Sequence, residues 1–220
     1  RAAIDRLRKA LGPITVLVNN AAHDERHKTE DVTPEYWDQR IAVNLKHKFF
    51  AAQAVIPDMK AAGGGSIINF GSTSWMIGQG GMAAYTAAKS GILGLTRSLA
   101  RDFGPFNIRV NAIAPGWINT EISKRGRENP EFNAKVMARL PAKRWADPME
   151  LAGTALFLCS PAGRLIARYK SRSGRNPPAM RRAHQGPRQP RRTTCRSADG
   201  RSPPPPLAAT STASPGSANW

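Results

Sequence analysis

The fold is indicated most clearly by one stretch of this 220-residue chain, Gly63-Gly64-Gly65-Ser66-Ile67-Ile68-Asn69-Phe70-Gly71-Ser72-Thr73-Ser74. Three glycines form a turn, a short apolar run follows, and a small polar loop comes directly after it. Two similar apolar runs, Thr15–Val18 and Ile108–Ala114, also lead into polar segments. Short continuous apolar runs are typical of strands that are buried on both faces of a sheet. We therefore expect buried strands at 15–18, 66–70 and 108–114.

Helical patterns, with apolar residues at spacings of three and four, separate these strands. Thr33 is expected to cap a long helix that starts at Pro34 and reaches about Ala62, with a kink or an early end at Pro57. Asp147 is the expected N-cap of the last helix. The other expected helices are Arg1–Leu11, Ala83–Phe103, Pro130–Leu140 and Pro148–Leu158. This alternation predicts an α/β fold with a parallel sheet and helices on both of its faces.

The charge is concentrated at one end of the chain. The net charge is +18, from 33 Lys and Arg against 15 Asp and Glu, and residues 164–220 hold twelve of the basic residues but only one acid, Asp199. This segment contains nine prolines and no Val or Phe, so it cannot bury enough apolar surface to offset the entropy of ordering. We expect a partial domain at 1–163 and a disordered basic tail at 164–220. The abrupt change after Gly163 suggests a shift of reading frame, with a genuine disordered tail as the alternative.

Composition argues against several other classes of protein. No apolar run approaches 18 residues, so no transmembrane helix is expected. Two cysteines, Cys159 and Cys195, cannot form a disulfide framework, which favours a reducing compartment and hence the cytoplasm. His23 and His27 lack an evident third ligand, so no metal site is predicted. Several basic residues are expected to be solvated surface charge: Lys46, Lys48, Lys124, Arg125 and Arg127.

Each expected strand runs into a distinctive polar segment. These segments are Asn19-Asn20-Ala21-Ala22, Gly71-Ser72-Thr73-Ser74 and Pro115-Gly116-Trp117-Ile118-Asn119-Thr120. In an open α/β sheet, ligands bind beyond the carboxyl ends of the strands. Any one segment could be an ordinary turn between a strand and a helix, but three of them predict a single edge that binds a ligand.

Tyr85 and Lys89 are four residues apart on an expected helix, so they share one face. A free phenol has a pKa of about 10, and a nearby ammonium group lowers that value. Tyr85 would then act as a general acid or base near neutral pH, and Ser72 would hydrogen-bond the reacting oxygen. The alternative is a Tyr and a Lys on a partly exposed helix face, because this spacing alone is common.

The order and spacing of these motifs over residues 1–162 resemble the short-chain dehydrogenase/reductase family. The resemblance implies a Rossmann-like three-layer α/β/α fold that binds NAD or NADP. It implies that Tyr85 transfers a proton, Lys89 binds the nicotinamide ribose and lowers the pKa of Tyr85, Ser72 positions the substrate oxygen, and Asn44 holds a water of the proton relay. The positions that match cofactor contacts are Asn20, Ala21, Tyr85, Lys89, Pro115, Gly116, Ile118 and Thr120.

A narrower likeness is to the aldose 1-dehydrogenases of that family, of the galactose, arabinose or xylose type. It rests on His23–Lys28, Tyr36–Ile41 and Ile68–Ser72. It implies that a monosaccharide is oxidised at C1, with Ser72, Tyr85 and Trp117 at the substrate, while Trp75 and Gln79 are further candidates for sugar contact. The alternatives are a 3-oxoacyl thioester reductase or another alcohol dehydrogenase, and, from a different class, an inactive fragment whose basic tail binds nucleic acid or another anionic polymer.

The resemblance also implies that parts of the family's pattern are missing. The glycine-rich dinucleotide fingerprint would precede Arg1, and a last strand would follow Gly163. We therefore expect a sheet that lacks its first half and its last strand, and the preference between NAD and NADP cannot be inferred. Related intact enzymes are homo-oligomers, with the helices at 33–62 and 83–103 at one interface.

Overall fold

The computed structural model describes residues 2–166 of the chain. The predicted basic tail lies outside the described residues, apart from its first three positions. Within the described part, strands and helices alternate in sequence, as expected of an α/β fold. None of the described helices is long and apolar enough to cross a bilayer.

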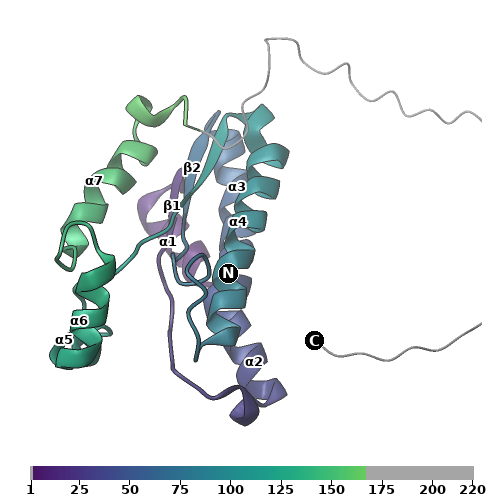
Figure 1. Cartoon of the computed structure of the whole chain (residues 1–220). Helices are drawn as coiled ribbons and strands as arrows, with labels where there is room; N and C mark the ends of the chain where they lie inside the picture. The colour runs from purple at the N-terminus through teal and green to yellow at the C-terminus, as the bar shows by residue number, and fades with distance from the viewer. Residues whose placement is uncertain (1, 167–220) are drawn as a thin grey trace, which may run out of the picture. The chain divides into compact units, whose positions relative to one another are not determined.

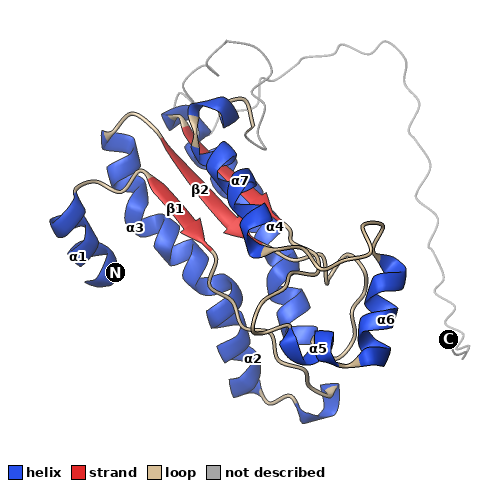
Figure 2. Cartoon of the chain, turned by 90° about the vertical axis from the view of Figure 1, so that its left-hand side faces the viewer, coloured by secondary structure: helices blue, strands red, loops and turns tan. Residues whose placement is uncertain are grey.

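Three parallel strands form the sheet in the order β1 (Val16–Asn19), β2 (Gly65–Phe70) and β3 (Ile108–Ile113). In this register Val18 is paired with Ile68, and Ile68 with Asn111. Figure 2 shows the strands side by side with their carboxyl ends at one edge. The three predicted strands are therefore confirmed to within a residue or two at each end.

Helices lie on both sides of this sheet. In Figure 1, α3 and α4 cover one face and α7 covers the other, which confirms the three-layer α/β/α arrangement. The helices are α1 (Ala2–Leu11), α2 (Pro34–Ile41), α3 (His47–Ala61), α4 (Ala83–Phe103), α5 (Lys124–Glu128), α6 (Pro130–Arg139) and α7 (Pro148–Cys159). A π-helical turn, Ala42–Lys46, joins α2 to α3, and short 3-10 turns occupy Thr29–Asp31, Gly104–Phe106 and Pro161–Gly163.

The helix starts follow from local side-chain chemistry. The Thr33 side chain accepts a hydrogen bond from the backbone N–H of Tyr36, and Pro34 occupies the first turn of α2. Asp147 and Glu150 form a reciprocal capping box at the start of α7. Both predicted caps are confirmed.

Pro57 does not end its helix, because α3 continues to Ala61. A proline inside a helix removes one backbone hydrogen bond, at a cost of about 3 kcal/mol. On both sides of Pro57, α3 places Val55, Ile56 and Met59 in the buried core. This packing favours continuation of the helix, so the early end allowed by the sequence is not found.

The core has two parts because β2 alternates its side chains between the two faces of the sheet. Ile67 packs on α3 and α4 in a cluster that includes Val55, Met59 and Leu99. Ile68 and Phe70 point the other way and pack on Leu158 of α7. Strand β2 is therefore buried on both faces, as its continuous apolar run predicts.

Strand β1 differs from the prediction, because it is buried on one face only. Leu17 packs against the core beneath α3, whereas Val16 and Val18 are 44% and 45% exposed. The physical reason is position: β1 lies at the edge of the described sheet, and the cluster under α7 involves only β2 and β3. The expectation of burial on both faces is wrong for this strand.

Candidate active site

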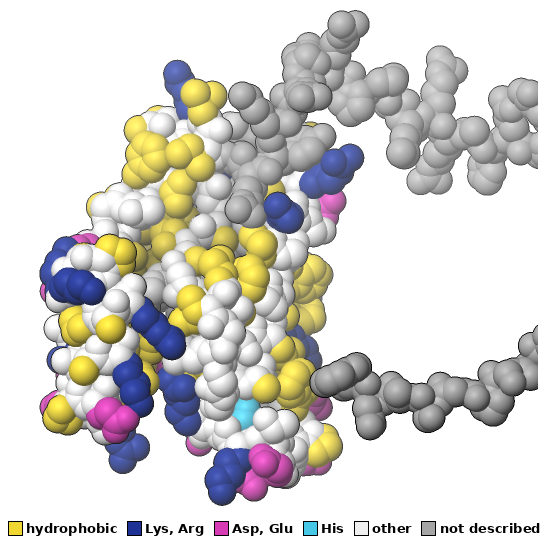
Figure 3. Space-filling view, viewed as in Figure 1, with side chains coloured by type: hydrophobic (Ala, Val, Ile, Leu, Met, Phe, Trp, Pro, Cys, Tyr) yellow, Lys and Arg dark blue, Asp and Glu magenta, His cyan; other side chains and the backbone are white. Residues whose placement is uncertain are grey.

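A cavity of about 950 Å³ opens at the carboxyl edge of the sheet. Its wall includes the loops after all three strands, the first turn of α4 and the segment that carries α5 and α6. The space-filling view shows a hollow between the α5–α6 part and the rest of the molecule, with basic side chains at its rim (Figure 3). The three polar segments that the sequence places at strand ends thus meet at one site.

Two of the predicted reacting groups face this cavity. Ser72 follows β2 and Tyr85 lies in the first turn of α4, and both side chains line the wall. The Ser72 side chain lies close enough to the Tyr85 phenol to favour its ionised form. The Ser72 hydroxyl also accepts a hydrogen bond from the backbone N–H of Ser74 at 3.1 Å, which orients it. Ser74 is more deeply buried than Ser72, although it lines the same cavity.

Lys89 lies one turn after Tyr85 on α4 and is only 3% exposed. Its Nζ donates a hydrogen bond to the backbone carbonyl of Phe70 at 3.1 Å and sits 5.3 Å from the centre of the Tyr85 ring. Burial lowers the pKa of Lys89 to about 8, and the Asp24 carboxylate partly opposes that effect. Helix geometry therefore brings the two side chains together, as the four-residue spacing predicts.

The pKa of Tyr85 is governed mainly by the burial of its own side chain. Burial raises the pKa of the Tyr85 phenol above its ordinary value, the Asp24 charge adds to the increase, and the interaction with Ser72 opposes it. The Lys89 ammonium group lies over the Tyr85 ring and donates to the Phe70 carbonyl. Burial thus dominates the pKa of Tyr85 in this structure, and the expectation that Lys89 lowers that pKa stays a prediction.

Asn44 lies within the π-helical turn and is fully buried. Its side-chain Nδ2 donates to the carbonyls of His23 and Arg40, and its Oδ1 accepts from the His23 backbone N–H, all at 2.9–3.0 Å. The side chain of Asn44 thus fastens the loop after β1 to the helix. The sequence predicts one long helix at 33–62 and gives no sign of this turn.

The predicted cofactor contacts divide into two groups. Gly116, Ile118 and Thr120 line the cavity together with Trp117. Asn20, Ala21 and Pro115 lie in the strand-end loops but do not line the cavity. Asn44 in the π-helical turn and Lys89 on α4 also lie outside its lining. Of the additional sugar-contact candidates, Gln79 lines the wall and Trp75 does not.

Trp117 belongs to an aromatic cluster. Its ring packs edge-to-face on Phe132 and Trp145, with ring centres 5.5 and 5.2 Å away. The Trp145 indole N–H donates to the Asn133 side chain at 2.8 Å, so the cluster is anchored to α6. All three rings line the cavity and give one side of it a rigid aromatic surface.

Sequence reasoning missed Lys48, which is 0% exposed although surface charge is predicted there. Its Nζ donates to the carbonyls of Asn19 at 2.7 Å and Ala21 at 3.3 Å, directly behind the loop that follows β1. Burial lowers its pKa to about 7, and repulsion from Lys89 contributes. The signal was available in the sequence, because Lys48 shares a helical face with the apolar residues Ala52 and Val55.

Comparisons with known proteins give consistent relatives. A family profile described as enoyl-(acyl carrier protein) reductase matches residues 1–167. A probable galactose dehydrogenase of Rhizobium meliloti is 49% identical over 160 residues, which cover 73% of this chain and 62% of that protein. A D-xylose 1-dehydrogenase of Caulobacter vibrioides is 46% identical over 158 residues, which cover 72% of this chain and 63% of that protein. The chain thus spans less than two thirds of the length of these relatives.

Solved structures show the same fold. A putative gluconate dehydrogenase from Agrobacterium tumefaciens superposes with a TM-score of 0.73 at 37% identity, covering 76% of this chain and 66% of the other. A gluconate 5-dehydrogenase from Burkholderia cenocepacia, solved with NADP and tartrate, gives 0.72 at 35% identity, with coverage of 76% and 65%. The similarity therefore extends from sequence to tertiary structure.

Proposed function

This chain belongs to the short-chain dehydrogenase/reductase family, and from that premise we propose that its site interconverts a hydroxyl and a carbonyl group with NAD or NADP as hydride carrier. The proposed substrate group is the C1 hydroxyl of an aldose. The observation that carries the proposal is the meeting of Ser72 and Tyr85 in one cavity, with Lys89 one turn behind them.

The residues divide the chemistry between them. Ser72 would hold the reacting oxygen by a hydrogen bond, and Tyr85 would exchange a proton with that oxygen. Because burial raises its pKa, Tyr85 carries its proton at neutral pH and is set to donate it to a carbonyl oxygen. In the oxidising direction, Tyr85 would first release that proton to solvent. The phenolate would then accept the proton of the C1 hydroxyl as the C1 hydride leaves for the nucleotide. The aromatic side formed by Trp117, Phe132 and Trp145 would pack on the C–H face of a sugar ring.

The donor set at the strand ends fits a nicotinamide nucleotide. Lys89 uses one of its three N–H groups on Phe70, which leaves two donors for ribose hydroxyls. Asn20 is exposed in the loop after β1, and Gly116, Ile118 and Thr120 form the facing wall. When bound, the nucleotide would accept or supply the hydride.

The names of two relatives, a galactose dehydrogenase and a D-xylose 1-dehydrogenase, support neutral aldoses as the proposed substrates of this chain. Other relatives are named for gluconate derivatives, and the matching family profile is described as an enoyl-(acyl carrier protein) reductase. Sugar acids and oxoacyl thioesters are therefore the competing substrates to include in a test.

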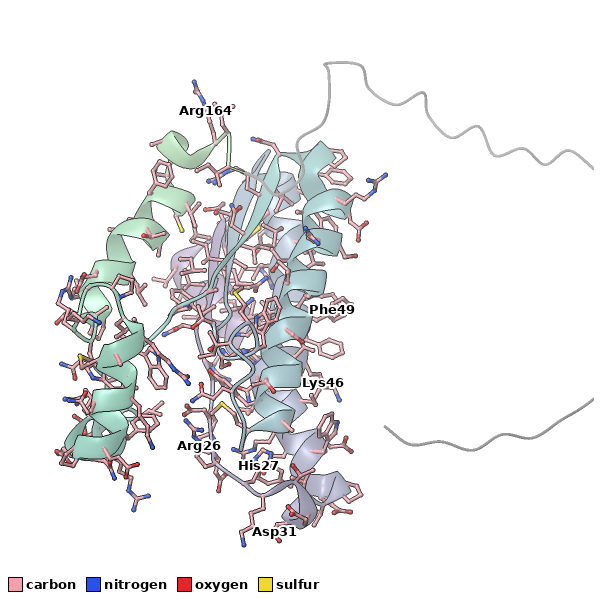
Figure 4. The ribbon with its side chains drawn as sticks, viewed as in Figure 1. Arg26, His27, Asp31, Lys46, Phe49 and Arg164 are labelled. Carbon is pink, nitrogen blue, oxygen red and sulfur yellow. The ribbon has the colours of Figure 1, made fainter. Side chains whose placement is uncertain are left out.

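We also propose that the chain associates with a second copy through α3. Phe49 and Phe50 stack edge-to-face with ring centres 5.3 Å apart, yet each side chain is more than 40% exposed. Figure 4 shows Phe49 pointing away from the sheet. An exposed aromatic pair on a helix is a feature of protein–protein interfaces.

The test is hydride transfer by the full 220-residue chain. We expect D-galactose or D-xylose to support the formation of NADH or NADPH, measured at its near-ultraviolet absorbance, and Tyr85→Phe to lower the rate by about a hundredfold or more. The matched control is Ser90→Ala on α4, since within residues 2–166 the Ser90 hydroxyl bonds only to the Ala87 carbonyl and lies outside the cavity. A wild-type rate in Tyr85→Phe, or no cofactor reduction with any aldose, would contradict the proposal.

A further inference from the structure

The loop that follows β1, residues 23–28, is held in place at its start. Asn44 bonds both the N–H and the carbonyl of His23. The Arg40 guanidinium group, 8% exposed, contacts the His23 ring and forms an ion pair with Glu25 at 3.2 Å. The Asn44 bonds hold the backbone of His23, and Arg40 holds the side chains on both sides of Asp24.

The same loop is also held at its end. The backbone N–H of His27 donates to the Gly81 carbonyl at 3.0 Å, and the Arg26 guanidinium group donates to the Gly80 carbonyl at 3.1 Å. The Tyr36 hydroxyl contacts Nδ1 of His27 at 3.1 Å. Figure 4 shows Arg26 and His27 next to each other near the lower end of the molecule. The loop is thus attached to α2 and to the segment before α4.

Asp24 is placed in the cavity by this loop. Asp24 lines the same cavity as Ser72 and Tyr85, and its charge acts on both Tyr85 and Lys89. Among residues 2–166, no hydrogen bond or ion pair engages the Asp24 carboxylate, whereas its neighbours Glu25 and Arg26 both have partners. The Asp24 carboxylate is therefore a hydrogen-bond acceptor near the reacting groups, and within residues 2–166 its oxygens have no protein partner.

A carboxylate in this position has two consequences for a substrate. Its two oxygens accept hydrogen bonds from neighbouring hydroxyl groups, as on adjacent carbons of a sugar. It also repels a second carboxylate brought close to it. Two cations, Arg26 and Arg125, also line the cavity and would attract an anion. Discrimination between neutral and acidic sugars therefore requires that the carboxylate of the acidic sugar comes close to Asp24.

We propose that Asp24 is a substrate-binding residue that selects neutral polyhydroxy substrates and disfavours those with a carboxylate group. This inference rests on the proposed function, since it concerns the same site. It names the substrate class as neutral aldoses rather than sugar acids.

The test is direct binding of two probes to the full chain, measured by saturation-transfer NMR at fixed salt. D-Galactose is the neutral probe, and D-galacturonate keeps the C1 hydroxyl but carries a carboxylate. We expect the wild type to bind galactose at least about tenfold more tightly than galacturonate. Asp24→Asn should weaken galactose binding by about tenfold and reduce that preference, because charge-assisted hydrogen bonds are lost.

The matched control is Asp31→Asn. Asp31 is labelled in Figure 4 and does not line the cavity, so this change removes the same charge at a position away from the site. It should leave both affinities within about twofold, the range of a screened surface charge. The inference is overturned if Asp24→Asn binds both probes as the wild type does, if galacturonate binds as tightly as galactose, or if neither sugar binds.

Failure of the proposed function would look different. If the sugars bind in the expected pattern but no cofactor is reduced, the hydride-transfer proposal fails and the role of Asp24 stands. If cofactor is reduced and Asp24→Asn leaves the preference unchanged, the inference about Asp24 fails alone. A thermal melt followed by circular dichroism separates either outcome from loss of folding, since the Asp24 side chain is exposed and its change is isosteric.

Discussion

Three ionisable side chains near the carboxyl ends of the strands, Lys48, Lys89 and Tyr85, have pKa values shifted toward the neutral form. Burial is the largest cause in each case. Each side chain makes its contacts to backbone carbonyls or to another site residue, without a paired opposite charge. At the residue scale, the site is therefore shaped by desolvation more than by ion pairing.

Lys48 gives a test of this effect through the pH dependence of stability. Its pKa is 10.5 in the unfolded chain and about 7 in the folded protein, so between these values the unfolded chain binds more protons. The free energy of unfolding should therefore rise as the pH increases from 7 toward 10.5, by up to a few kcal/mol. The stabilising contribution is lost again as the pH falls through 7.

Urea unfolding at pH 7, 8 and 9 measures this dependence as a difference between the wild type and Lys48→Met. We expect the wild type to gain stability relative to Lys48→Met as the pH rises. Lys46→Met is the control, because Lys46 is exposed two residues earlier and its removal should not change the slope. Parallel curves for the wild type and Lys48→Met would show that Lys48 is not desolvated.

At the scale of single elements, α7 is the described helix that covers the second face of the sheet. Its capping box closes the first turn, and at its other end the guanidinium group of Arg109 on β3 donates to the carbonyls of Leu158, Cys159, Ser160 and Gly163. The Ser66 hydroxyl adds a bond from β2 to the Leu158 carbonyl at 3.1 Å. The helix is thus held at both ends by named polar contacts.

The capping box predicts a measurable loss on substitution of Asp147. Asp147→Ala removes the acceptor for the Met149 N–H and should lower the free energy of unfolding by about 1 kcal/mol. Glu131→Ala is the control, because its exposed ion pair with Lys135 should contribute less than about 0.5 kcal/mol. Equal stabilities of Asp147→Ala and the wild type in urea would contradict the role of the cap.

At the scale of the whole molecule, two apolar surfaces remain exposed on opposite sides of the layer formed by α3. One is the face of β1 with Val16 and Val18, and the other is the stacked pair Phe49 and Phe50. Edge strands are prone to pair with other chains, whereas an aromatic pair on a helix suits a defined interface. The two surfaces therefore predict different kinds of association.

Sedimentation velocity distinguishes these kinds of association. If α3 forms the interface, the wild type is dimeric or larger at micromolar concentration and Phe49→Glu shifts it to monomer. Val18→Lys, which changes the sheet edge, should leave that oligomer intact and lower only nonspecific aggregation. The proposed interface is contradicted if Phe49→Glu sediments like the wild type while Val18→Lys dissociates it.

Much of the candidate site follows from local sequence pattern. The four-residue spacing of Tyr85 and Lys89 places them on one helix face, and the polar segments after three apolar runs meet at one edge because parallel strands share their direction. The roles assigned to Tyr85, Lys89, Ser72 and Asn44 stay predictions until the variants are measured. So does the boundary at Gly163 between domain and tail.

The sequence by itself determined the strands, most of the helices, the caps at Thr33 and Asp147, and the family. These features depend on periodicity, capping chemistry and motif order among residues close in the chain. Only the tertiary structure decided which groups are desolvated: Lys48 is buried, Val16 and Val18 are exposed, and the pKa of Tyr85 is raised. It also introduced the π-helical turn at Asn44 and placed Asp24 in the cavity. The physical reason is that burial and electrostatics depend on what packs opposite a side chain, and those partners lie tens of residues away in sequence.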